Sequence, residues 1–223
     1  MVTLIKPIFP HPIKLKIHLE NMPHNVYRII LVPENINMLQ LHSVIQVAMG
    51  WEFAHLFQFS DKKLKPTLVA NLHGEDPDSD LGFGFGSVEE IKAHKVFLKN
   101  EFLEDRSAAA FWYWYDFGDD WWHKITFQKV NKKDLRVFKS EPICVDAFGA
   151  CPPEDVGGPW GYADFCEAIS NKKHPDYKEL REWMGMNLRE KYDFESVDVE
   201  YINKTLSDFF QSEEWNRINN DYL

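Results

Sequence analysis

The sequence predicts an α+β fold, with a mostly antiparallel sheet and packed helices in a single domain. Apolar and polar residues alternate near the N-terminus and again in an aromatic-rich segment at the middle of the chain, which is typical of half-buried strands. Apolar residues at helical spacing follow both regions. No internal repeat and no long linker divides the 223 residues, so we expect residues 1–223 to be one domain.

The N-terminal half is expected to open with a hairpin and a helix. Residues 13–19 and 26–32 alternate in the manner of strands, with turn residues between them. The next apolar residues, Leu41 to Ala48, indicate a helix with Asn37 as N-cap, Gln40 completing a capping box and Gly50 just past its end. The further elements expected here are short strands at 55–60 and 66–70, a loop at 73–86 and a short helix opened by Ser87 and Glu90.

An aromatic hairpin is predicted in the middle of the chain, from strands 110–115 and 121–130 with a turn at 116–120. Its second strand places Trp121 and His123 on one face, and Trp122 and Lys124 on the other. Residues 151–161 (CPPEDVGGPWG) contain too much proline and glycine for a helix, so they predict a rigid loop. The last elements expected are helices at 162–169, 175–184 and 199–210, the last capped by Asp198, and a tail after about residue 211.

The composition excludes several classes of protein. There are 35 acidic and 25 basic residues, a net charge of −10, so direct binding to the nucleic-acid backbone is not expected. The three cysteines are unevenly spaced, which is typical of reduced thiols rather than a secreted disulfide framework. No apolar run has the length of a membrane span. We therefore expect a cytoplasmic protein without a membrane anchor.

Three segments together resemble a known family. They are LHSVIQVAMGW with HLFQF (residues 41–51 and 55–59), YDFGDDWWHKI (115–125) and CPPEDVGGPWGY (151–162). In this order they resemble the plasmid pRiA4b ORF-3-like family, over about residues 13–206. The resemblance implies an α+β domain without an established biochemical activity, and some members are labelled as resolvase-like proteins of transposons. Trp122 and the pair Ala147-Phe148 depart from the family pattern.

A set of acidic residues and one histidine is the strongest candidate for chemistry. Carboxylates and imidazole together suit Mn²⁺, Zn²⁺ or Fe²⁺, so a divalent metal could act there in hydrolysis. The alternative is structural: aspartates that hydrogen-bond a turn, a histidine in the core, and an acidic pair that braces the loop. The candidate residues are Asp116, Asp119, Asp120, His123, Glu154 and Asp155.

Aromatic residues gather in the same two segments. Aromatics on both faces of one strand cannot all be core unless both faces are covered. A ligand groove, a homodimer surface and a core are three interpretations that remain open. The aromatic residues proposed for binding are Tyr115, Trp121, Trp160 and Tyr162.

The leading functional hypothesis is a non-enzymatic binding domain. The hairpin and the Pro/Gly loop would form one aromatic and acidic surface for a protein, a peptide or a small ligand, because rigid folds commonly carry function on loops. The alternative is a metal-dependent hydrolase of phosphoesters or nucleic acid, with the acidic set as ligands and general base. A third hypothesis is an accessory protein in mobile-element DNA transactions.

Overall fold

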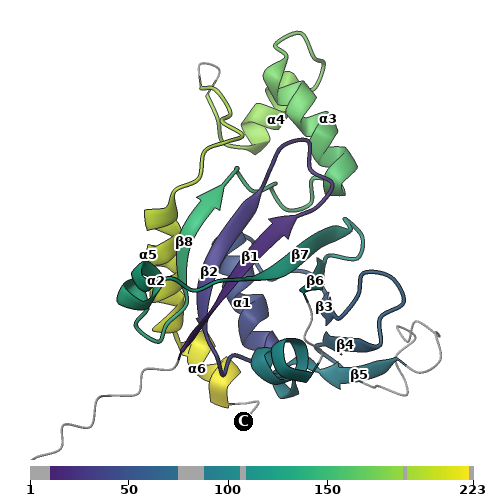
Figure 1. Cartoon of the computed structure of the whole chain (residues 1–223). Coiled ribbons are helices and arrows are strands. Elements are labelled where there is room, and N and C mark those ends of the chain that lie inside the picture. Colours follow the sequence, from purple (N-terminus) through teal and green to yellow (C-terminus); the bar gives the residue numbers. More distant parts are fainter. Residues whose placement is uncertain (1–10, 75–87, 106–108, 188–189, 221–223) are drawn as a thin grey trace, which may run out of the picture.

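The computed structural model describes residues 11–74, 88–105, 109–187 and 190–220, which form one α+β domain around an eight-stranded sheet (Figure 1). The strand order is β5-β4-β3-β6-β7-β1-β2-β8. Every pair is antiparallel except β4 with β5. The strands are β1 (Pro12–Leu19), β2 (Tyr27–Pro33), β3 (Phe57–Ser60), β4 (Leu68–Asn71), β5 (Glu89–Lys92), β6 (Ala110–Tyr115), β7 (Trp121–Gln128) and β8 (Ile143–Phe148).

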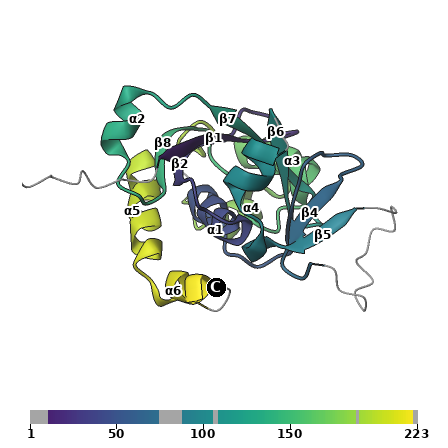
Figure 2. The ribbon, with the colours of Figure 1, turned by 60° about the horizontal axis from the view of Figure 1, so that its bottom comes forward.

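The helices gather mainly on one side and at one end of this sheet. They are α1 (Met38–Met49), α2 (Lys132–Val137), α3 (Gly158–Ser170), α4 (Tyr177–Trp183), α5 (Val199–Phe210) and α6 (Glu213–Asn220), with a 3₁₀ turn at Ala93–Lys95 and a π-helical segment at Lys99–Asp105. In Figure 1 α1 lies behind β1, β2 and β7, and Figure 2 shows α5 and α6 beside α1. The α3–α4 pair projects from one end of the sheet (Figure 1).

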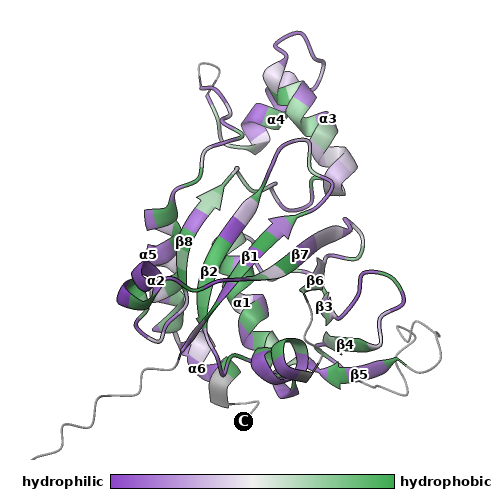
Figure 3. Ribbon diagram, viewed as in Figure 1, coloured by the Kyte–Doolittle hydropathy of each residue, from purple (hydrophilic) through white to green (hydrophobic). Residues whose placement is uncertain are grey.

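Helix α1 is the central element of the core. Its start has the predicted capping box, in which the Asn37 side chain accepts from Gln40 N and the Gln40 side chain accepts from Asn37 N. Its end has the predicted Gly50 in the left-handed region, with φ 85°. Every residue of α1 except Gln40 is buried, and Figure 3 shows hydrophobic residues along the helix and along the strands in front of it. Burial of this apolar surface is the main stabilising contribution.

The predicted alternation on β6 and β7 is confirmed. Tyr113, Tyr115, Trp121 and His123 point into the core and are at most 1% exposed. The opposite face of the strands holds Trp112, Trp114, Trp122 and Lys124, of which the three tryptophans are partly buried and the lysine is exposed. A period of two therefore divides the aromatic residues between the core and the outer face.

A buried cation ties β2 to the end of α1 and to the end of the neighbouring strand β8. Arg28 is 2% exposed, and its guanidinium donates to the carbonyl oxygens of Ala48, Phe148 and Gly149 as well as to that of Tyr27. These carbonyls come from the end of α1 and from the chain at the end of β8. The guanidinium therefore gives hydrogen bonds to four backbone carbonyls, as a buried polar group requires.

One expectation for the first half is corrected, and another falls mostly outside the described residues. The short helix expected from Ser87 and Glu90 is wrong, because residues 89–92 form β5, which pairs in parallel with β4. Tertiary pairing with Leu68–Asn71 decides the conformation there, whereas a capping box is a purely local signal. Ser87 itself and residues 75–86 of the expected loop lie outside the described residues.

Two expectations for the second half also change. The Pro/Gly loop was expected to contain no helix, yet α3 begins within it at Gly158, with Pro159 in the first turn, where a backbone N–H needs no helical partner. The expected tail after residue 211 contains α6, whose Trp215 is buried. Strand β8 and helix α2 were not predicted. The expected helices at 175–184 and 199–210 are present as α4 and α5, with Asp198 capping α5.

Candidate functional site

The turn between β6 and β7 is organised by Asp116. Its backbone adopts φ 50°, a left-handed conformation, and its N–H donates to Leu56 O over 2.9 Å. One carboxylate oxygen, Oδ1, accepts from Gly118 N at 3.0 Å and from Asp119 N at 3.3 Å. This is the turn role considered for Asp116 in the structural interpretation. Because Oδ1 is held by the backbone, the orientation of the second oxygen is also fixed.

The hairpin turn packs directly against the Pro/Gly loop. Asp119 Oδ2 accepts a hydrogen bond from Gly157 N at 3.2 Å. Gly158, with φ 69°, lies so close to the turn that a Cβ atom there would be 2.1 Å from Asp119 O. Only glycine fits both the positive φ and this close approach. Two segments about forty positions apart are thereby held as one unit.

Glu154 is a second link between the same segments. Its carboxylate accepts from the Tyr115 hydroxyl over 2.5 Å and from Glu52 N over 2.8 Å. Burial, together with the neighbouring Glu154, raises the pKa of Tyr115, so the phenol stays protonated and donates. The loop is tied further by Trp51 Nε1, which donates to Pro152 O at 3.0 Å. Glu154 thus braces the loop.

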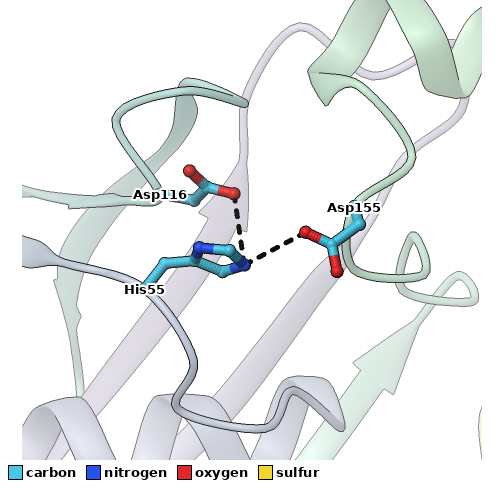
Figure 4. A group of neighbouring side chains, drawn as sticks. All are labelled: His55, Asp116 and Asp155. Carbon is cyan, nitrogen blue, oxygen red and sulfur yellow. Dashed lines mark ion pairs between the residues drawn. The ribbon is translucent and has the colours of Figure 1, made fainter.

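Three side chains from three segments converge beside these links (Figure 4). His55, just before β3, places Nε2 at 3.6 Å from Asp116 Oδ2 and at 3.2 Å from Asp155 Oδ1. One ligand atom from each residue lies within 4.8 Å of the others. The His55 side chain is 28% exposed, that of Asp116 is 13% exposed, and that of Asp155 is 76% exposed. The site is therefore anchored on its inner side and open on the Asp155 side.

The six residues predicted for metal chemistry do not all meet. Asp116 and Asp155 converge, whereas Asp119 and Glu154 are engaged in the links between loops. Asp120 accepts from Trp122 Nε1 at 2.7 Å and is exposed. The expectation that His123 binds a metal together with these carboxylates is wrong. Its position on β7 turns its side chain into the core.

His123 is a core histidine, as the structural interpretation held. It is 0% exposed and lies edge-on to Trp51, with ring centroids 5.3 Å apart. Neither ring nitrogen makes a hydrogen bond of acceptable geometry to the described residues. Burial lowers the pKa of His123 to about 3, so the ring is neutral in the folded protein.

The aromatic residues proposed for a binding surface separate into two groups. Tyr115, Trp121 and Tyr162 are at most 1% exposed, so the expectation that they line a surface is wrong, because the sheet and the first turns of α3 turn them inward. Trp160, in the first turn of α3, is 86% exposed. The outer face of the hairpin adds Trp114 and Trp122, which stack with centroids 4.8 Å apart.

His55 is the residue that sequence reasoning missed. It begins the HLFQF segment, but no spacing rule links it to residues sixty and one hundred positions away. Its nearest signal is its place as the first residue of the strand predicted at 55–60, because polar side chains gather at the end of a sheet. Only strand pairing between β3 and β6, which sets Phe57 beside Tyr115, brings His55 to Asp116.

Comparison with known proteins gives relatives of unknown function. The sequence pattern of the plasmid pRiA4b ORF-3-like proteins matches residues 11–201. The uncharacterised protein y4hQ of Sinorhizobium fredii is 36% identical over 200 residues, which cover 88% of this chain and 91% of that protein. A crystal structure of a protein of unknown function from Methanosarcina mazei Go1 is similar, with a TM-score of 0.67 and 28% identity over 85% of this chain and 95% of the other. Among the described residues, no helix has the length and apolar character to span a bilayer.

Proposed function

The chain belongs to the plasmid pRiA4b ORF-3-like family, and on that premise we propose that it is a non-enzymatic binding domain. Its binding surface is the region where the hairpin turn (116–120) meets the Pro/Gly loop (151–158), together with the adjoining His55 and Trp160, and we name this region the acidic junction. The observation that carries this proposal is the pair of direct links between them, Asp119 to Gly157 and Glu154 to Tyr115. A surface fixed in this way binds with a smaller ordering cost.

The charge of the acidic junction indicates the kind of partner. Its carboxylates outnumber the single imidazole of His55, and the whole chain has a net charge of −10. Such a surface attracts cationic groups and repels the phosphates of nucleic acid. The exposed indole of Trp160 follows directly in α3 and offers an apolar contact of the kind that anchors interfaces. We therefore propose a basic protein segment with an apolar side chain as the partner.

Binding is favoured over hydrolysis by the hydrogen bonds of the carboxylates. A general base has to be free to reach the attacking water. Asp119, Asp120 and Glu154 accept hydrogen bonds from Gly157, Trp122 and Tyr115, respectively. These contacts support a role for the three carboxylates in shaping a surface rather than in moving protons.

The proposal is tested with arrays of lysine- and arginine-rich peptides, each carrying one aromatic or aliphatic residue, against acidic peptides of the same length. We expect binding to the basic set only, weakened by salt. Trp160→Ala should weaken this binding about tenfold or more. Trp183→Ala is the matched control, because Trp183 on α4 is 50% exposed and lies outside the junction. Equal binding of both peptide sets, or equal effects of the two variants, would contradict the proposal.

A further inference from the structure

We infer that His55, Asp116 and Asp155 form a site for one divalent cation of the Zn²⁺ class. The inference deepens the proposed function and rests on the same acidic junction. The cation would bind at the inner edge of the junction, where one imidazole and two carboxylates converge (Figure 4).

The two distances from His55 are those of a coordination sphere, and the two carboxylate oxygens lie within 4.8 Å of each other. Nε2 of His55 is 3.6 Å from Asp116 Oδ2 and 3.2 Å from Asp155 Oδ1. A charge-assisted hydrogen bond would be shorter, at about 2.7–2.9 Å. Bonds of about 2.0–2.2 Å to a tetrahedral Zn²⁺ place neighbouring ligand atoms about 3.3 Å apart. The observed separations match this value better than they match a direct hydrogen bond.

The nitrogen of His55 supplies a second, independent observation. Nε2 is shielded from solvent, and neither approach to a carboxylate has the geometry of a hydrogen bond. A polar atom that is buried without a partner is costly, so a ligand that pairs with this nitrogen would be favoured. The nitrogen points toward both carboxylates (Figure 4), and a cation at their centre would satisfy it.

The inner carboxylate is oriented in advance. Asp116 Oδ1 is held by two backbone N–H groups of the turn, so Oδ2 is presented to His55. Fixing a ligand through its neighbours in this way is how proteins orient metal ligands. Asp155 is 76% exposed, so it is the side chain that closes on the ion, and its side of the site admits a further ligand.

The donor set indicates which cations bind. One imidazole and two carboxylates are a borderline set, which suits Zn²⁺ and Mn²⁺ and offers too few oxygens for Ca²⁺. Three protein ligands leave a coordination position open to water or to a group of a partner. Because the ion links the segment before β3, the hairpin turn and the Pro/Gly loop, its binding stabilises the junction.

The test is calorimetric titration of the EDTA-stripped and dialysed full chain with Zn²⁺, Mn²⁺ and Ca²⁺. We expect one Zn²⁺ per chain, and a loss of affinity of about tenfold or more in His55→Gln and in Asp155→Asn. Asp155 is exposed, so its variant should fold. The matched control is Asp176→Asn, because Asp176 Oδ2 lies 3.8 Å from His174 Nδ1 in a histidine–aspartate pair that has no third member among the described residues.

Two results would overturn the inference: no stoichiometric binding of any of these ions, or binding that His55→Gln and Asp155→Asn leave unchanged. The peptide assay, repeated in EDTA with the Trp160→Ala variant, separates this failure from failure of the proposed function. If peptides bind and metal does not, only the cation site is wrong. If metal binds and peptides do not, only the binding function is wrong.

Discussion

The Tyr115 hydroxyl on β6 donates a 2.5 Å hydrogen bond to Glu154 Oε1, which joins the inner face of the sheet to the Pro/Gly loop. Tyr115→Phe should destabilise the fold by about 1–3 kcal/mol, because it removes one of the two donors to a partly buried carboxylate. Urea unfolding measures this change. Tyr27→Phe is the control, because the Tyr27 hydroxyl bonds to Asp146 at an exposed position. Similar losses of unfolding free energy in both variants would show that the hydrogen bond to Glu154 contributes no more to stability than an exposed one.

Gly158 should tolerate no side chain. Gly158→Ala adds a Cβ atom 2.1 Å from Asp119 O and also forces alanine into φ 69°. We expect a loss of more than about 2 kcal/mol, because steric overlap adds to a left-handed conformation that costs about 1 kcal/mol by itself. Gly50→Ala separates the two effects, since Gly50 has φ 85° and a Cβ atom added there would meet nothing within 4 Å. Denaturant midpoints that fall equally would contradict the close packing.

Two buried histidines should make the protein less stable in acid. Burial lowers the pKa of His42 and of His123 to about 3, below the ordinary value of 6.5. The unfolded chain therefore binds more protons between these values, and stability falls as the pH drops below about 6.5 and continues to fall toward about 3. From pH 8 to pH 5 each histidine should cost about 2 kcal/mol.

The variant His123→Leu isolates one of these contributions. It removes the titrating group, so its loss of stability from pH 8 to pH 5 should be about 2 kcal/mol smaller than that of the wild type. Urea unfolding at both pH values gives the comparison, and the difference between pH values is independent of any packing change that leucine causes. Parallel pH profiles for the two proteins would show that His123 does not carry this dependence.

Helix α6 should contribute to stability through Trp215. The indole is 9% exposed and packs on Phe210, with ring centroids 4.0 Å apart. Trp215→Ala should lower the free energy of unfolding by about 3 kcal/mol. Trp160→Ala removes an equally large side chain that is 86% exposed, so its effect on stability should stay within about 0.5 kcal/mol. Thermal melts of the two variants test whether the end of the chain is part of the core.

Local patterns were sufficient for much of the fold. The capping box of Asn37 and Gln40 and the glycine at position 50 determine where α1 begins and ends. Alternation on β7 correctly separated His123 from Trp122, because successive residues of a strand face opposite sides. The parallel strand β5 could not be found in this way, since residues 89–92 become a strand only by pairing with β4.

In the candidate site, too, some features followed from local sequence patterns and others did not. Asp116 was identified as a carboxylate that could bind a metal, and its turn role was the structural alternative, because Asp in a turn bonds the neighbouring backbone N–H groups. The burial of Tyr115 and Tyr162 was missed, because an aromatic residue next to a loop has the same local pattern whether it points inward or outward. The burial of a side chain depends on which layer of the fold covers it, and local sequence patterns do not indicate that layer.

By itself, the sequence determined the fold class, the main helix and the hairpin, because periodicity and capping act over a few residues. The family followed from the resemblance of three sequence motifs. Only the tertiary structure decided that His55 meets Asp116 and Asp155. This meeting needs β3 to pair with β6 and the Pro/Gly loop to fold back on the hairpin turn. Contacts between distant segments arise from the sum of strand pairing and core packing, so no local spacing encodes them.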